Sequence, residues 1–151
     1  MPSHSEQQIL PYSSQQLFDL VADVERYPEF LPWCRAARVI ERGEHELVAE
    51  LVIAFHHLTE SYSSRVLLKR PSTGYDPGAI DVTMIKGPFD FLINRWRFLP
   101  KENGCEIDFF LDFAFRSRLL DKMIGGVFSK ATSKMVAAFR ERADVLYGAK
   151  P

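Results

Sequence analysis

The chain contains 151 residues with a mass of 17.4 kDa, which is the size of one ordinary domain. Its 19 basic and 20 acidic side chains give a formal net charge of −1, and this balance disfavours binding to DNA through bulk charge. Hydrophobic residues make up 46% of the chain and charged residues 26%. No apolar run reaches the roughly 18 residues of a membrane span, so the sequence indicates a globular domain, not a disordered or membrane-spanning chain.

The first residues of the chain predict no targeting signal. Residues 1–8 contain neither a basic segment followed by an apolar stretch nor an Arg-rich amphipathic stretch, so we expect neither secretion nor import into an organelle. Cys34 and Cys105 lie far apart in the sequence and form no metal-binding or redox motif. We therefore expect both cysteines to be reduced thiols in a cytosol.

The N-terminal part predicts a strand followed by one or two short helices. Residues 3–10 favour a first strand, which a proline ends. Ser13 and Gln16 have the spacing of a capping box, and apolar residues follow at helical spacing, so we expect a helix over about residues 14–24. The two prolines at positions 28 and 32 leave room for one short helical turn between them.

The middle of the chain predicts six consecutive strands. Their expected ranges are 38–41, 46–55, 58–69, 80–85, 91–99 and 107–115. The last is the clearest, because apolar residues occupy every second position from Ile107 to Phe115. Short turns rich in glycine and proline separate the strands, which predicts an antiparallel meander.

From Ser117 onward the apolar period becomes helical. Apolar residues recur three or four apart as far as Leu146, and charged residues lie mostly on the other side. A single helix of about 28 residues, about 42 Å long, is expected here.

This order of elements predicts an α+β fold of the helix-grip type, with residues 1–151 forming a single domain. A curved antiparallel sheet of about seven strands would wrap around the long C-terminal helix, with two short helices after the first strand. Seven of the 12 phenylalanines lie between Phe89 and Phe115. That many rings either fill a solid core or line an apolar cavity between helix and sheet, and composition alone leaves both possibilities open.

Four segments carry a resemblance to a known family. They are Leu17–Cys34 (LFDLVADVERYPEFLPWC), Lys86–Phe89 (KGPF), Trp96–Pro100 (WRFLP) and Phe139–Gly148 (FRERADVLYG). Together they resemble the coenzyme Q-binding, START-like family of the polyketide cyclase/dehydrase superfamily. The resemblance covers nearly the whole chain and implies a START/Bet v 1-like domain with an internal hydrophobic cavity.

The resemblance implies two different functions. Eukaryotic members are described as binding ubiquinone and supporting respiratory electron transport, whereas similar bacterial proteins are described as ribosome-association toxins that hinder the joining of ribosomal subunits. We hypothesise a non-enzymatic chain that binds a hydrophobic small molecule, with ubiquinone or a related isoprenoid lipid as the ligand and no other cofactor. Binding to a ribosomal subunit is the alternative. A polyketide aromatase or cyclase ranks last, because such an enzyme needs an acid or base in the cavity and no inward-facing His is predicted.

The lack of an import segment fits a bacterial member of the family. The expected location is therefore the cytoplasm, with a peripheral position at the inner membrane and transient membrane contact as a variant. The ribosome alternative predicts a cationic surface patch. Its candidate residues are Arg35, Arg38, Arg42, Lys122, Lys130, Lys134 and Arg140.

We predict that a bound hydrophobic ligand contacts apolar and aromatic side chains on the inward faces of the sheet, the last helix and the proline-rich corner formed by residues 27–34. These candidate ligand-binding residues are Val24, Tyr27, Phe30, Leu31, Trp33, Leu51, Ile53, Phe55, Phe89, Phe91, Trp96, Phe98, Phe109, Leu111, Phe113, Met123, Ile124, Val127 and Phe128.

Three segments allow both a functional and a structural interpretation. Residues 27–34 form either a cavity mouth, where Tyr27 offers a hydroxyl, or a rigid corner that plugs the core, with Glu29 solvated. Residues 87–89 form either part of an entrance or only a tight turn. The pair at 125–126 consists of two glycines, which either act as a hinge or pack closely against a bulky sheet residue such as Trp96.

The remaining polar candidates are few. Asn94 and Glu60 are expected to point inward and to need hydrogen-bond partners, with Arg65 as one candidate. His56, His57 and Glu60 do not suit a metal ion, because a strand and turn separate them too far and no third ligand is evident. The sequence contains no nucleophile elbow and no nucleotide-binding glycine motif.

Overall fold

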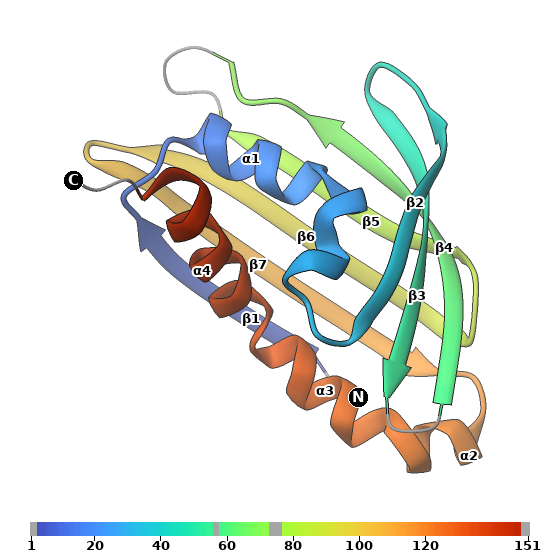
Figure 1. The fold of residues 1–151 in the computed structure, drawn as a ribbon. Coiled ribbons are helices and arrows are strands. Elements are labelled where there is room, and N and C mark those ends of the chain that lie inside the picture. Colours follow the sequence, from blue (N-terminus) through green and yellow to red (C-terminus); the bar gives the residue numbers. More distant parts are fainter. Residues whose placement is uncertain (1–2, 56–57, 73–76, 149–151) are drawn as a thin grey trace.

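The computed structural model describes residues 3–55, 58–72 and 77–148 (Figure 1). The strands are β1 (Ser3–Leu10), β2 (Cys34–Arg42), β3 (Glu46–Phe55), β4 (Leu58–Lys69), β5 (Gly78–Lys86), β6 (Phe89–Lys101) and β7 (Gly104–Phe115). The helices are α1 (Ser14–Ala22), the 3-10 helix η1 (Val24–Glu29), α2 (Arg118–Leu120), the π-helical segment η2 (Asp121–Gly125), α3 (Gly126–Ser133) and α4 (Met135–Tyr147).

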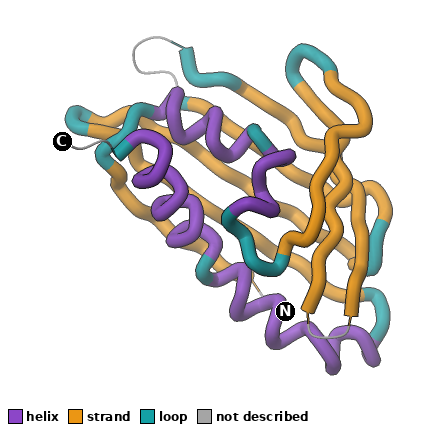
Figure 2. The backbone as a smooth tube through the Cα atoms, in the orientation of Figure 1, coloured by secondary structure: helices purple, strands orange, loops and turns teal. Residues whose placement is uncertain are grey.

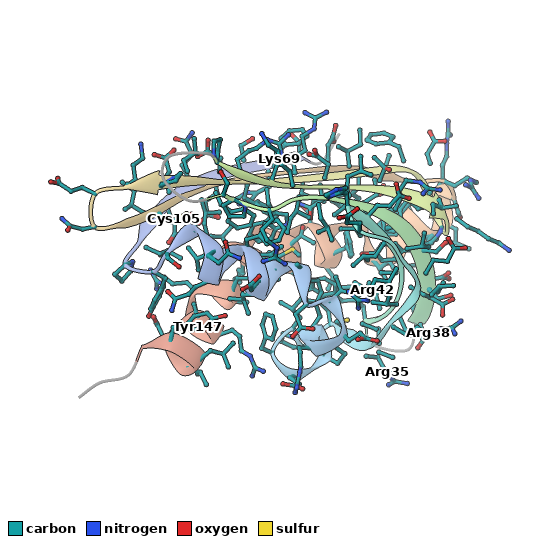
Figure 3. All side chains as sticks on the ribbon, turned by 90° about the horizontal axis from the view of Figure 1, so that it is seen from above. Arg35, Arg38, Arg42, Lys69, Cys105 and Tyr147 are labelled. Atoms are coloured by element: carbon teal, nitrogen blue, oxygen red, sulfur yellow. The ribbon has the colours of Figure 1, made fainter. Side chains whose placement is uncertain are left out.

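All seven strands form one antiparallel sheet in the order β1-β7-β6-β5-β4-β3-β2. The helices lie on one face of this sheet, and among the described residues no helix covers its other face (Figure 2). Seen from above, the end of the sheet that carries β2 and β3 bends toward the helices (Figure 3). This is the helix-grip, START/Bet v 1-like fold expected from the order of elements, and the sequence prediction of fold class is confirmed.

Alternation of apolar residues decides which face of each strand is covered. In β3 the odd positions from Leu47 to Phe55 are buried and the even positions are half-buried, as their hydropathy predicts. The same pattern holds in β7 from Ile107 to Phe115. Register shifts in β2, in β4 opposite β5, and after Phe89 in β6 interrupt the ladder, and such irregularities increase the local twist of a sheet.

The helix after β1 begins as predicted. The Ser13 side chain accepts a hydrogen bond from the Gln16 backbone N–H, and the Gln16 side chain accepts one from the Ser13 backbone N–H, which completes the capping box. The second helical element differs from its prediction, because the 3-10 helix runs over Val24–Glu29 and includes Pro28, whereas a turn between the two prolines was expected. Pro28 is the fifth of the six residues of this helix, so it removes an amide donor only near the helix's C-terminal end.

The expected continuous C-terminal helix is interrupted. Lys134 has φ −102° and ψ 10°, and it separates α3 from α4. Just before the break, the Thr132 hydroxyl donates to the carbonyls of Phe128 and Ser129, and the Ser133 hydroxyl donates to that of Lys130. Hydroxyls that occupy backbone carbonyls bend helices, and the apolar period of the sequence does not reveal this competition.

The paired glycines of this segment do not pack against Trp96. A Cβ on Gly125 would lie 2.5 Å from Oδ1 of Asp121 in the preceding turn, and a Cβ on Gly126 would meet nothing within 4 Å. Of the two interpretations of this pair, close packing against a bulky sheet residue is therefore wrong. Across the described residues, no helix has the length and apolar character needed to cross a bilayer.

Candidate functional site

A small apolar cavity lies between the sheet and the helices, with a volume of about 50 Å³. Its walls come from α1 and η1, from the inward faces of β3 to β7, and from α3 and α4. The lining residues are Val21, Val24, Tyr27, Trp33, Ala49, Leu51, Tyr62, Ser64, Val66, Ile80, Val82, Leu92, Asn94, Leu111, Phe128, Thr132 and Met135. Room for one or two water molecules remains, which is much less than the roughly 150 Å³ that holds a benzene ring.

One polar group in this wall has no partner. Ser64 is 2% exposed, and its hydroxyl makes no hydrogen bond within the described structure. By contrast, the Asn94 amide donates to the Phe110 carbonyl, and its oxygen accepts a hydrogen bond from the Trp96 indole. A buried unpaired hydroxyl destabilises a fold, so the Ser64 hydroxyl is available to a polar atom in the cavity.

Two tyrosines also border the cavity. The Tyr27 hydroxyl donates to the Val21 carbonyl at 2.5 Å, so it is already used within the corner and does not face a guest as an open donor. The Tyr62 ring packs edge-on against Phe89 at 5.3 Å. Burial raises the pKa of both phenols, and each stays neutral at physiological pH.

A second, open groove of about 550 Å³ lies outside the cavity, between the proline-rich corner, the end of β3 and the break between α3 and α4. It is lined by Phe30, Leu31, Pro32, Trp33, Ala54, Phe55, Val127, Ala131, Lys134, Met135, Ala137, Ala138 and Glu141. Trp33 and Met135 line both the groove and the cavity. These two side chains therefore form the partition between the apolar groove and the closed interior.

The proline-rich corner is tied to α4 by charge. Glu29 is exposed, as predicted, and its carboxylate also accepts hydrogen bonds from Arg26 at 2.9 Å and from Arg142 at 2.5 Å. These two guanidinium groups hold the pKa of the Glu29 carboxyl below its usual value. Arg142 also lies over the Phe30 ring, 5.3 Å from its centroid.

Two aromatic clusters attach the C-terminal helices to the sheet. Phe128 of α3 is surrounded by five rings, at 4.7 to 6.1 Å between centroids: Trp33, Phe55, Phe89, Phe113 and Phe115. Phe139 of α4 is surrounded by three, at 4.9 to 5.3 Å: Tyr27, Phe30 and Trp96. Most of the phenylalanine-rich interior is therefore filled by interlocking rings, and the cavity is what they leave.

The predicted ligand-binding residues fall into three groups. Those that line the cavity are Val24, Tyr27, Trp33, Leu51, Leu111 and Phe128. Those packed in the surrounding core, or between core and groove, are Phe30, Leu31, Ile53, Phe55, Phe89, Trp96, Phe98, Phe109, Phe113 and Ile124. Those outside the core are Phe91, Met123 and Val127, because Phe91 lies on the outer face of β6 and the other two are exposed on η2 and α3.

Several cavity residues were not among the candidates. Tyr62, Ser64 and Val66 share the inward face of β4, but the serines and threonines of that strand obscured its alternation. Among the polar candidates, Arg65 points outward and pairs with Glu46, so it does not satisfy Asn94. The turn at Gly87 places the glycine against Tyr62, where a Cβ would lie 2.4 Å from the tyrosine Cβ, and it borders neither the cavity nor the groove.

The predicted metal and cation candidates are placed as follows. His56 and His57 lie outside the described residues. Within the described residues, no cluster of three potential metal ligands occurs. Arg35, Arg38 and Arg42 all lie on the edge strand β2 (Figure 3). Arg38 pairs with Glu50 at 2.7 Å, and Arg42 lies 3.9 Å from Glu25. The β2 arginines are therefore largely balanced by carboxylates.

The chain is similar to proteins with two kinds of name. The ribosome association toxin RatA of Rickettsia prowazekii is 46% identical over 95% of this chain and 97% of its own length. The mitochondrial coenzyme Q-binding protein COQ10 homolog B of Xenopus laevis is 32% identical over 96% of this chain and 59% of its own length. Neither name is that of an enzyme.

Structural similarity and a family model agree with the fold. A START superfamily protein from Mycobacterium smegmatis has a TM-score of 0.74, covering 95% of this chain and 98% of its own, although only 15% of residues are identical. Residues 10–140 match the family described as polyketide cyclase/dehydrase and lipid transport. Together with the apolar interior and the helix-grip sheet, this match shows that the chain belongs to the polyketide cyclase/dehydrase and lipid transport family.

Proposed function

We propose that the chain is a non-enzymatic binder of an apolar small molecule that carries an oxygen atom, such as ubiquinone or a related isoprenoid lipid. The observation that carries the proposal is the unpaired Ser64 hydroxyl in a mostly apolar cavity wall. Apolar contacts would supply most of the affinity, and a hydrogen bond to Ser64 would orient the polar end of the guest. Redox chemistry would belong to the quinone and its partner enzymes.

Binding requires the interior to open. A volume of about 50 Å³ is too small for a quinone ring, so the guest must displace side chains that now fill the space. We expect Trp33 and Met135 to move, because these two residues line both the groove and the cavity. Met135 directly follows the break at Lys134, where the helix has already lost its continuous ladder.

A serine pair on β4 provides the test. We expect Ser64→Ala to weaken the binding of a short-chain ubiquinone, followed by quenching of tryptophan fluorescence, about two- to tenfold. The same variant should raise the stability of the ligand-free protein, because it removes an unsatisfied hydroxyl. Ser63→Ala is the matched control, since Ser63 is the neighbouring residue on the opposite face of the strand.

A second measurement asks for the guest itself. Protein purified from its native host is extracted with organic solvent, and the extract is examined by mass spectrometry. A retained quinone or isoprenoid lipid supports the proposal. Repeated absence of any apolar guest, together with equal quinone binding by the Ser64 and Ser63 variants, would refute it.

Binding to a ribosomal subunit is the second candidate, and the comparisons support it at least as well. The relative named a ribosome association toxin is 46% identical to this chain over nearly its full length. In addition, Lys122, Lys130 and Lys134 are exposed, and their side chains form no ion pair in the described structure. Co-sedimentation with purified ribosomal subunits at moderate salt tests this candidate. Replacement of these three lysines by glutamate should abolish the co-sedimentation.

The aromatase or cyclase hypothesis has little support in the cavity. The described residues that line it include no Asp, Glu, His or Lys. Its titratable side chains are Tyr27 and Tyr62, and burial raises the pKa of both phenols, which makes them weak proton donors. General acid–base catalysis needs a titratable group within reach of the reacting atoms. The cavity therefore favours binding over catalysis.

A further inference from the structure

The segment from Arg118 to Lys134, which we call the cationic arm, exposes a row of apolar side chains. Leu119, Met123 and Val127 follow one another at intervals of four residues along α2, η2 and α3. They are 67%, 54% and 37% exposed, although their spacing places them on one side of the helix. An exposed apolar row of this kind marks an interaction surface.

Positive charges flank this row. The cationic arm contains Arg118, Lys122, Lys130 and Lys134 against the single acidic residue Asp121, which gives a net charge of +3. No side chain of these five residues forms an ion pair within the described part of the chain. The partner of this surface is therefore expected to be both anionic and apolar.

We propose that the cationic arm lies on the surface of an anionic lipid bilayer, with Leu119, Met123 and Val127 inserted between the headgroups. Amphipathic helices at membrane surfaces combine exposed apolar residues with flanking lysines and arginines. RNA would attract the same cations, but phosphate contacts make no use of a row of aliphatic side chains. The apolar row therefore favours a lipid surface over a nucleic acid.

The cationic arm lies next to the open groove. Val127, Ala131 and Lys134 also line the open groove, so the apolar row leads directly to the partition formed by Trp33 and Met135. A chain docked in this way would present the groove to the bilayer. The docking itself does not depend on whether the interior accepts a guest.

Vesicle flotation of the ligand-free protein tests the proposal. We expect binding to vesicles of equal parts phosphatidylglycerol and phosphatidylcholine, little binding to phosphatidylcholine alone, and weaker binding as salt increases. Lys122→Ala and Lys130→Ala should each lower the partition coefficient about fivefold. Leu119→Ser combined with Met123→Ser should lower it about tenfold or more.

Val145→Ser is the matched control. Val145 is 76% exposed on α4, outside the cationic arm, and its replacement should leave vesicle binding unchanged. Because all these side chains are exposed, thermal unfolding should be nearly the same in every variant, which separates docking from folding.

Two outcomes would overturn the proposal. One is an absence of binding to the anionic vesicles. The other is binding that needs Lys122 and Lys130 but is indifferent to Leu119 and Met123, which would assign the arm to a polyanion such as ribosomal RNA. No guest is present in this assay, so its failure leaves the proposed interior site standing, and failure of quinone binding leaves the membrane proposal standing.

Discussion

The two halves of the C-terminal helical segment are attached to the rest of the protein in different ways. On α4, Arg142 binds Glu29, the Tyr12 hydroxyl donates to Asp144, and the Tyr147 hydroxyl donates to the Gln16 carbonyl. In the described structure, no side-chain hydrogen bond or ion pair ties the cationic arm to the sheet or to the N-terminal helices. The arm is held by apolar contacts, above all through the Phe128 ring cluster.

The half with fewer polar contacts is the one that can move more easily. Directional polar contacts fix one geometry, whereas apolar contacts tolerate a shift as long as area stays buried. Local opening also starts where fewer interactions must be broken. We therefore expect the interior to open by displacement of the cationic arm relative to a fixed α4, with the break at Lys134 between them.

The largest effect is expected from the ring that holds the arm. Phe128→Ala leaves a hole among five aromatic neighbours, and we expect it to lower the free energy of unfolding by about 3–5 kcal/mol in chemical denaturation. Phe110→Ala is the control, because Phe110 is half-buried on the outer face of β7. A loss no greater than that of the control would show that the arm is held by other contacts.

The two native cysteines report where the fold opens first. Both are buried, and burial raises the pKa of Cys34 to about 11 and that of Cys105 to about 12, so a thiol reagent at neutral pH reacts only after opening. Cys34 directly follows Trp33 of the partition, whereas Cys105 lies near the turn between β6 and β7. We expect Cys34 to react about tenfold faster or more, which corresponds to about 1.4 kcal/mol in opening free energy.

Mass spectrometry of partly labelled protein measures both rates in one sample. Phe128→Ala should accelerate Cys34 more than Cys105. Equal rates at the two sites in the unmodified protein would mean that the molecule opens as a whole, and the contrast between the two halves would then be lost.

The tie between Glu29 and Arg142 makes the fixed half sensitive to acid. Because the folded pKa of Glu29 lies below its ordinary value of 4.5, its stabilising contribution is complete above that value and is lost as pH falls through the lower folded pKa. We expect Glu29→Gln to be less stable than the unmodified protein at neutral pH. The difference should shrink as unfolding is measured at successively lower pH below about 4.5.

Glu102 offers a matched control, because it is exposed and its side chain forms no ion pair in the described structure. Glu102→Gln, the same exchange at a site without this ion pair, should not reproduce the convergence toward low pH. A constant difference between the Glu29 variant and the unmodified protein across the acid range would show that the carboxylate does not stabilise the fold through its charge.

Much of the fold follows from local patterns, and the site follows from them less well. Alternation in β3 and β7 fixes which side chains face the helices, and Ser13 with Gln16 fixes the start of α1, so these elements were predictable. The helical spacing of apolar residues also led us to predict Met123 and Val127 as ligand-binding residues. Such spacing cannot distinguish a buried apolar face from an exposed one. The cavity volume depends on how tightly rings from distant segments interlock, and no single segment contains that information.

The smallest expected effect concerns the two glycines inside the arm. Gly126 is helical, with φ −66° and ψ −40°, and has open space where a Cβ would be, so Gly126→Ala should raise the free energy of unfolding by about 0.5–1 kcal/mol. At Gly125 the same Cβ would displace the Asp121 carboxylate, and Gly125→Ala should gain less or lose stability. Thermal unfolding of both variants measures the difference.

If Gly126→Ala also slows the entry of a quinone, the arm bends at its glycines during opening. If entry is unchanged while stability rises, the bend is confined to Lys134, as the comparison of the two halves predicts.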